Sequence, residues 1–214
     1  METVAIGIDL AWTRKNPSAL AVVSDELVLI DWVLCYEDYE IIEFVERHNA
    51  ENIIVCIDAP LIFPEEITSF RKCDAMLRKR GTRILPVQQA FFMKRFGCLR
   101  GKEIVKMLEE KGFLLSIQSH QRQIIEVYPH ATWKRMLRKV PKYKNVSQAK
   151  KREAIGLLSR SLVKAGLSKI EVMDLRGSYA GDLLDAAVCA LVGIWHLQGK
   201  TEVIGDEKDG FIVY

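Results

Sequence analysis

Short apolar runs separated by polar turns alternate along the chain with longer segments of helical spacing. The apolar runs predict strands at residues 4–8, 19–23, 27–33, 53–57 and 124–128, with shorter ones at 113–115 and within 202–214. Short turns join the first three strands, so we expect them to form an antiparallel meander. The wholly apolar run 53–57 is typical of a central, parallel strand.

Helical spacing predicts helices at residues 40–48, 147–165 and 182–197, and a mainly helical, glycine-interrupted segment at 69–111. Pro129 suits the first turn of a further helix after strand 124–128. Three antiparallel strands followed by a helix and more strands resemble the order of the ribonuclease H-like fold, in which the first strand lies beside the fourth. We therefore expect one α/β domain over residues 1–214, with a helical insertion at about 66–111.

The amino-acid composition indicates the cellular environment that we expect for the protein. About half of the 214 residues are hydrophobic and 28% are charged, as in globular proteins. No apolar run approaches the roughly 20 residues that span a bilayer, and the first residues lack a signal-peptide pattern. The five cysteines show no C-x-x-C spacing, which favours reduced, mostly buried thiols over a zinc site. These features predict a cytoplasmic protein with no membrane partner.

Charge is strongly segregated along the chain. Residues 71–152 hold 22 Lys+Arg against 5 Asp+Glu, although the whole chain has a net charge of only +3. Such segregation predicts a polyanionic partner, DNA or RNA. The candidate phosphate contacts are Arg71, Arg78, Arg80 and Arg83. The alternative is a solvated helix face that acidic neighbours balance in three dimensions.

Two aspartates directly follow buried strands. Asp9 follows the strand 4–8, and Asp58 follows 53–57. A carboxylate at such a position is costly unless it is hydrogen-bonded, paired or metal-bound. Ligand sites in α/β sheets lie beyond the carboxyl ends of strands, so two parallel neighbours would direct both carboxylates into one crevice. The alternative for each is a local turn or cap.

Three more carboxylates are candidates. Glu126 lies between apolar residues in the strand 124–128 and is predicted as a third ligand beside Asp58, unless that strand is a sheet edge with Glu126 in solvent. Asp182 and Asp185 open the apolar helix 182–197. Asp182 suits the N-cap and Asp185 a capping partner, but the apolar helix around Asp185 also favours a crevice-facing carboxylate.

Several carboxylates that converge without a compensating basic motif need a cation. Oxygen ligands of this kind suit Mg²⁺ or Mn²⁺. Two such ions about 4 Å apart would activate a water and stabilise the leaving oxygen of a phosphodiester. We therefore expect Asp9, Asp58, Glu126 and Asp185 to be catalytic, with Asp182 as a further metal ligand.

Five ordered motifs resemble a known family. They are GIDLAW at residues 7–12, CIDAPL at 56–61, RKCDAMLRKRG at 71–81, EVYPHA at 126–131 and GDLLDAAVCAL at 181–191. Together they resemble the domain of unknown function 429 family, described as predicted nucleases with a ribonuclease H-like fold. The resemblance covers nearly the whole chain and implies acidic residues like those of Holliday-junction resolvases, at Asp9, Asp58 and Asp185, with Asp182 as their companion. Glu126 has no standard counterpart there.

Three functions remain open from the sequence. The first is a metal-dependent nuclease acting on structured DNA or RNA, and the second is a nucleic-acid-binding protein without catalysis. The third is a phosphotransferase of the actin and sugar-kinase type, which is disfavoured because the bulky Leu10 and Trp12 follow Asp9 where those enzymes have a glycine-rich phosphate turn. The sequence leaves the oligomeric state open, a homodimer included.

Overall fold

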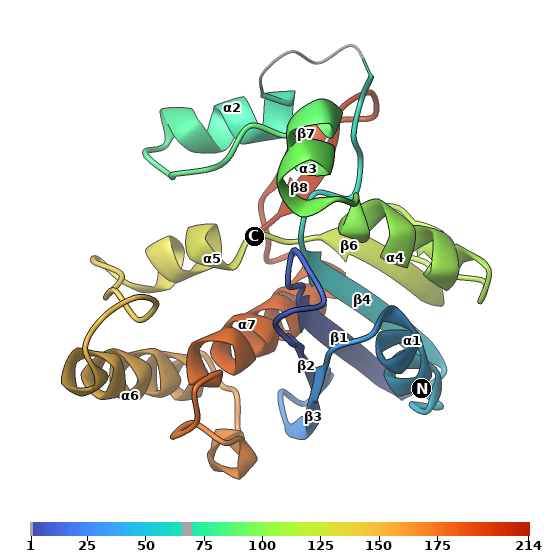
Figure 1. Cartoon of the computed structure of the whole chain (residues 1–214). Helices are drawn as coiled ribbons and strands as arrows, with labels where there is room; N and C mark the ends of the chain where they lie inside the picture. Colours follow the sequence, from blue (N-terminus) through green and yellow to red (C-terminus); the bar gives the residue numbers. More distant parts are fainter. Residues whose placement is uncertain (1, 66–69) are drawn as a thin grey trace.

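The computed structural model describes residues 2–65 and 70–214 and is built on a six-stranded mixed sheet of order β3-β2-β1-β4-β6-β5 (Figure 1). The strands are β1 (Thr3–Asp9), β2 (Ser18–Ser24), β3 (Leu29–Cys35), β4 (Asn52–Asp58), β5 (Leu114–Leu115) and β6 (Arg122–Glu126). β1, β2 and β3 are antiparallel neighbours, whereas β1, β4, β6 and β5 are parallel. The predicted meander and the pairing of the first and fourth strands are confirmed.

Helices cover both faces of this sheet (Figure 1). One face carries α1 (Asp38–Glu46) and α4 (Arg100–Glu109), and the other carries α7 (Ala180–Leu197), against which α5 (Pro129–Met136) and α6 (Gln148–Lys164) pack. α2 (Lys72–Lys79), α3 (Gln89–Phe96) and the hairpin of β7 (Val203–Asp206) and β8 (Gly210–Val213) lie beyond one end of the sheet. A short 3-10 turn spans Ile170–Val172.

Strand alternation divides the core between these two faces. Ala5, Ile54 and Cys56 pack with α7, whereas Ile6 and Val55 pack on the α1 and α4 side. On the α7 side β1 and β2 contribute the small residues Ala5, Ala19 and Ala21, and α7 approaches β1 closely at Gly7. A Cβ atom at Gly7 would lie 1.9 Å from the backbone oxygen of Ala186, so only glycine fits there.

The predicted helical insertion contains α2, α3 and α4, and its predicted start at about residue 66 falls outside the described residues. α7 is long and apolar enough to cross a membrane by length and composition alone, but 78% of that span is buried inside the protein, as in a core helix. All five cysteines are free, and four of them are buried.

Candidate functional site

Asp9 and Asp58 are register partners at the carboxyl ends of the parallel strands β1 and β4. Paired residues of parallel strands point to the same face, and these two continue the rows of Ala5 and Cys56 toward α7. The sequence prediction that the two carboxylates share one end of the sheet is therefore confirmed.

The first turns of α7 bring Asp182 and Asp185 to the same end. The predicted N-cap is wrong, because Tyr179 is the N-cap residue and Asp182 lies within the first turn. Asp185 is 3% exposed. Its Oδ1 accepts hydrogen bonds from Trp133 Nε1 and from the Tyr143 hydroxyl, each at 2.8 Å. Asp185 thus accepts from two neutral donors outside α7 and does not cap its own helix.

The ammonium group of Lys144 joins three of these aspartates. Its Nζ lies 2.8 Å from Asp182 Oδ1, 3.0 Å from Asp185 Oδ2 and 3.1 Å from Asp9 Oδ2. The sequence analysis assumed that no basic group compensates the converging carboxylates. That assumption is wrong, because Lys144 supplies one positive charge from the loop before α6.

The electrostatics follow from burial and crowding. Burial raises the pKa of Asp9 to about 7, with Lys144 opposing the rise and Asp185 adding to it. Burial and the neighbouring charges of Asp9 and Asp185 also raise the pKa of Asp58 well above its ordinary value. Burial lowers the pKa of Lys144, but the three aspartates outweigh that effect and raise it. One ammonium therefore neutralises the cluster only in part.

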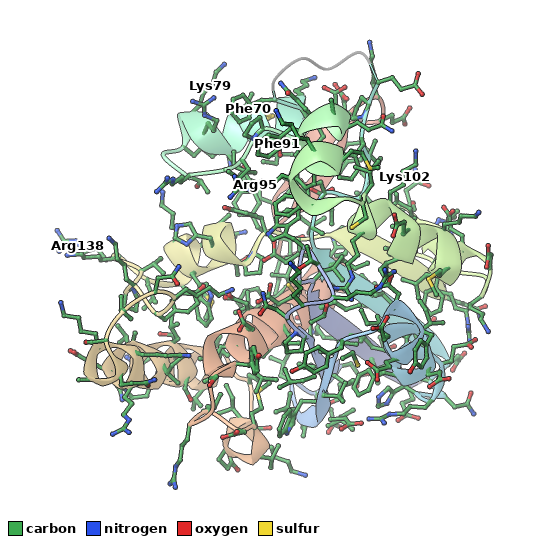
Figure 2. All side chains as sticks on the ribbon, viewed as in Figure 1. Phe70, Lys79, Phe91, Arg95, Lys102 and Arg138 are labelled. Atoms are coloured by element: carbon green, nitrogen blue, oxygen red, sulfur yellow. The ribbon has the colours of Figure 1, made fainter. Side chains whose placement is uncertain are left out.

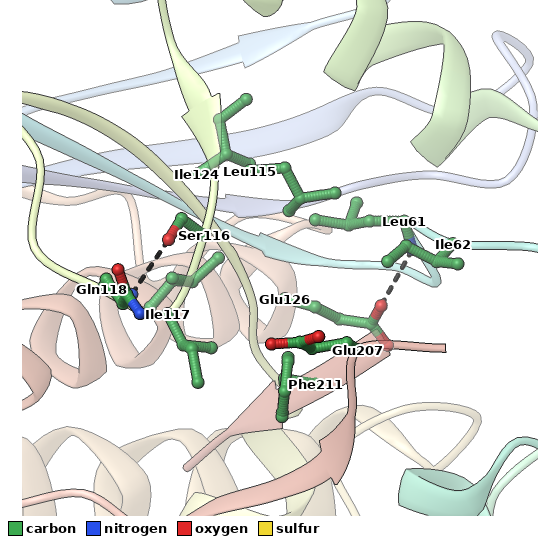
Figure 3. Close-up of a pocket in the computed structure, with 11 residues that line it drawn as sticks. Leu61, Ile62, Leu115, Ser116, Ile117, Gln118, Ile124, Glu126, Glu207 and Phe211 are labelled. Carbon is green, nitrogen blue, oxygen red and sulfur yellow. Dashed lines mark hydrogen bonds between the residues drawn. The ribbon is translucent and has the colours of Figure 1, made fainter. Parts of the chain in front are cut away.

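Glu126 is not among the carboxylates that Lys144 contacts. It pairs with Ile57, one position before Asp58, and successive strand residues point to opposite faces. Its Oε2 accepts hydrogen bonds from the Leu61 backbone N–H at 2.9 Å and from Arg71 Nη1 at 2.8 Å. Figure 3 shows Glu126 beside Leu61 in the lining of a cavity of about 260 Å³, and Glu126 also lines a second cavity together with Asp58. The structure thus brings Glu126 near Asp58 but pairs it with Arg71 rather than with the three aspartates around Lys144.

Arg71 is likewise placed differently from the prediction. It is 1% exposed, and its guanidinium lies 2.5 Å from Glu126 Oε1 and 3.0 Å from Asp74 Oδ2. A buried guanidinium that is saturated by two carboxylates is not available to a phosphate. Arg71 instead ties the start of α2 to the end of β6.

The other three candidate arginines are exposed around α2. Arg78 stacks over the Phe70 ring at 4.0 Å, and Arg80 pairs with Glu202 on the terminal hairpin. Figure 2 shows Phe70 and Lys79 with Phe91 and Arg95 at the end of the molecule formed by α2 and α3. Basic and aromatic side chains thus lie together on this face, which we call the α2–α3 face and define by Phe70, Arg78, Lys79, Phe91 and Arg95.

A groove of about 610 Å³ runs past the aspartates. Asp9, Trp12, Lys144 and Asp182 are among its lining residues. The buried side chain of Arg100, which is 4% exposed, holds the loop that carries Trp12. Arg100 donates to the Ala11 carbonyl at 2.8 Å and pairs with Asp38 at 2.7 Å. The site is therefore bordered by a braced loop on one side and by the Lys144 loop on the other.

Sequence reasoning missed Lys144, Tyr143, Trp133 and Arg100. Each acts on a residue far along the chain, such as Asp9 for Lys144 and Asp185 for Trp133. No local motif marks a long-range pair of this kind. The nearest signal was the basic loop at residues 134–144, read only as part of the positive segment.

The capacity of the cluster to hold a metal ion depends on its donor atoms and their spacing. Within residues 2–65 and 70–214, no three His, Cys, Asp or Glu side chains are arranged as ligands of a metal ion. The carboxylate oxygens lie 2.8–3.1 Å from Lys144 Nζ, whereas Mg²⁺ requires about 2.0–2.1 Å. The all-oxygen donor set nevertheless suits Mg²⁺ or Mn²⁺. By donor chemistry the residues fit such an ion, provided that it replaces the ammonium group.

The fold and the cluster define an α/β protein with a mixed sheet and four aspartates at one end of it. The chain belongs to the family described as Protein of unknown function (DUF429), whose sequence model matches residues 7–210. This match confirms the family that the five motifs resemble. None of the curated proteins compared with the chain matches it.

Proposed function

We propose that this chain is a metal-dependent nuclease with a ribonuclease H-like fold, which hydrolyses phosphodiester bonds in structured DNA or RNA. The observation that carries the proposal is the convergence of Asp9, Asp182 and Asp185 on one cation position, with Asp58 in register beside Asp9. The strand order, with the first strand between the second and the fourth, supports the fold assignment.

In this proposal Asp9, Asp58, Asp182 and Asp185 hold Mg²⁺ or Mn²⁺. Such an ion supplies a water of lowered pKa and stabilises charge on the leaving oxygen. Trp133 and Tyr143 keep the Asp185 carboxylate oriented. Lys144 lies on a loop, and its side chain is 48% exposed, so it is free to turn toward a phosphate when an ion takes its place. Glu126 and Arg71 have no part in the proposed site.

A second candidate is a nucleic-acid-binding protein without catalysis. The observation that favours it is again Lys144, which already satisfies three of the four aspartates. If the ammonium is permanent, no ion binds and the cluster is a structural link between β1, α7 and the Lys144 loop. The basic and aromatic α2–α3 face would then account for the whole function.

The two candidates separate in a cleavage assay. End-labelled single-stranded, duplex and branched DNA and RNA are incubated with the protein in Mg²⁺, in Mn²⁺ or in EDTA. We expect ion-dependent cleavage that Asp9→Asn and Asp185→Asn each abolish. Glu153→Gln, at an exposed position on α6, is the control and should cleave like the wild type. Binding without cleavage under every condition would favour the second candidate.

A further inference from the structure

A second cavity, of about 330 Å³, lies at the carboxyl ends of β4 and β6, beneath the chain that connects α2 to α3. Its walls are mainly apolar and include Ile84, Leu85, Val87, Phe92 and Ile212. Trp12 and Tyr128 add aromatic rings, and the Tyr128 hydroxyl donates to the Arg83 carbonyl at 2.7 Å. Tyr128 thereby ties the covering chain to the end of the sheet. We call this space the Leu85 cavity.

The polar groups in the Leu85 cavity restrict what it can bind. Asp58, Asp74 and Glu126 contribute carboxylates to its lining, so an anionic group is repelled. Arg71 already satisfies Asp74 and Glu126, which leaves Asp58 as the carboxylate that can accept from a ligand, through the oxygen that it does not give to the proposed ion. A neutral, flat, mostly apolar ligand with a hydrogen-bond donor on its edge fits these walls. Nucleobases have this character, and carboxylates accept hydrogen bonds from their exocyclic amino groups.

The Leu85 cavity adjoins the groove that is lined by Asp9 and Asp182. Trp12 lines both spaces, and Asp58 is the register partner of Asp9 across β1 and β4. A nucleotide with its phosphate at the aspartates therefore has its base beside the cavity. Arg83 is exposed and also lines the cavity, where it can meet the next phosphate of the strand. The volume of about 330 Å³ lies at the lower end of the roughly 300–1,000 Å³ of small-molecule pockets, which is room for one base.

We propose that the Leu85 cavity receives one unpaired nucleobase of the nucleic acid whose phosphate lies at the aspartate cluster. This inference rests on the proposed nuclease function and names its substrate class. A base within a continuous duplex is stacked on both sides and must leave the stack to enter a pocket. The substrates are therefore strands with an unpaired nucleotide at the cut: single strands, branch points or flaps.

The test uses short fluorescein-labelled oligonucleotides of mixed sequence, as DNA and as RNA, in which a single abasic site is moved stepwise along the strand. We expect one abasic position, next to the cleaved bond, to lower kcat/KM by at least about five-fold, the lower end of the effect of one base–aromatic stack. Abasic sites elsewhere should have little effect. Comparing the DNA and RNA oligonucleotides shows from which nucleic acid the base comes.

Two variants connect this effect to the cavity. Leu85→Trp places a bulky side chain at a cavity-lining position that is 45% exposed, and Leu114→Trp makes the same change at a position on β5 that is 47% exposed and outside the cavity lining. We expect Leu85→Trp to slow cleavage of the intact strand by at least about five-fold but to leave the abasic strand unaffected. Leu114→Trp should behave like the wild type. Thermal melting confirms that both variants fold.

Equal cleavage of all abasic strands, or equal effects of the two tryptophan variants, would overturn the cavity assignment while leaving the nuclease intact. If the wild type cleaves nothing, the nuclease proposal fails, and fluorescence-anisotropy binding of the same strands in EDTA decides the cavity separately. A loss of affinity at one abasic position that Leu85→Trp reproduces would then support the cavity. If neither the abasic position nor Leu85→Trp changes the affinity, the cavity assignment is overturned.

Discussion

Lys144 and Asp9 form a 3.1 Å ion pair although 135 residues of chain separate them. The same ammonium reaches Asp182 and Asp185 on α7, so one lysine links the central strand, the core helix and a surface loop. In a metal centre the Lys144 ammonium would compete with the ion for the same carboxylate oxygens. The effect of replacing Lys144 therefore distinguishes a structural ion-pair cluster from a metal-binding site.

Removing the lysine charge should expose the repulsion among the aspartates. In EDTA, we expect Lys144→Gln to lower the free energy of unfolding by about 1–2 kcal/mol, less than the loss of a fully buried partner because the lysine is half exposed. In Mg²⁺ the variant should gain more stability than the wild type, since the ion no longer competes with an ammonium. Denaturant unfolding with and without the ion measures both effects.

Lys142→Gln removes an exposed charge from the same loop and is the matched control, with an expected change within about 0.5 kcal/mol. A Lys144→Gln variant that is destabilised equally in EDTA and in Mg²⁺ would show that the lysine is a permanent structural partner.

The pH dependence of the metal-free protein should report Asp9. Its pKa in the folded protein is about 7, against an ordinary 3.8, so the folded state keeps a proton that the unfolded state loses. The resulting stabilisation is complete below the ordinary pKa and is lost as the pH rises through about 7. Asparagine does not titrate, so the Asp9→Asn variant does not lose stability in this way as the pH rises. Its stability relative to the wild type should therefore rise between about pH 4 and about pH 8.

Thermal melting in EDTA at several pH values measures this difference. Between about pH 4 and about pH 8 we expect the melting temperature of Asp9→Asn to rise relative to that of the wild type by up to about 10 °C, because a shift of about three pKa units corresponds to roughly 4 kcal/mol and each kcal/mol moves the melting temperature of a domain of this size by about 2–4 °C. A difference between the two proteins that stays constant with pH would contradict the raised pKa.

Glu126 should matter for stability but not for metal binding. Replacing it by glutamine leaves Asp74 as the one carboxylate paired with the buried Arg71 guanidinium among the described residues, and losing one partner of a buried pair costs about 3–5 kcal/mol. The gain in melting temperature on adding Mg²⁺ should equal that of the wild type. Glu207→Gln, at an exposed position in the lining of the same 260 Å³ cavity, is the control and should change neither quantity. Loss of the Mg²⁺ response in Glu126→Gln alone would restore Glu126 as a ligand.

Glu126 also shows where sequence reasoning stops. Apolar runs and short turns were enough to predict the strands and the antiparallel meander, because alternation and turn length are local properties. The place of the first strand beside the fourth, which brings Asp9 and Asp58 together, was expected from the order of the elements and its likeness to the ribonuclease H-like fold. From the sequence, the side chain of Glu126 could be assigned to the same face of its strand as Ile124 and Tyr128. The sequence did not show on which face of the sheet α7 packs, so it did not show whether Glu126 faces Asp185.

The ion pairs of Arg71 and Lys144 were not predicted, for a related reason. Both belong to the segment with 22 basic residues, and charge counting treats all of them as surface. The partners of Arg71 are Glu126 and Asp74, and those of Lys144 lie on β1 and α7. Only the fold brings these acids to the two cations, so the sequence offered no means to separate them from exposed neighbours such as Arg78.

Arg78 should contribute to nucleic-acid affinity through phosphate charge alone. We expect Arg78→Glu to weaken binding to all sequences similarly and to reduce the slope of log affinity against log salt by about one or more. Arg160→Glu makes the same change on the exposed surface of α6 and is the control. Fluorescence anisotropy over a range of salt concentrations provides both slopes. Identical losses in the two variants would show a general charge effect rather than a binding face at α2 and α3.

The central claim is that the aspartate cluster binds a divalent ion in the folded protein. Its most direct test is the melting temperature of the wild type, Asp9→Asn and Asp185→Asn as Mn²⁺ or Mg²⁺ is titrated. An ion that binds only the folded state at about 100 times its dissociation constant adds about 2.7 kcal/mol of stability. We predict a rise in melting temperature with ion concentration for the wild type and a flat response for both variants. A wild type that responds to neither ion, or variants that respond as it does, would contradict the metal site and the nuclease proposal built on it.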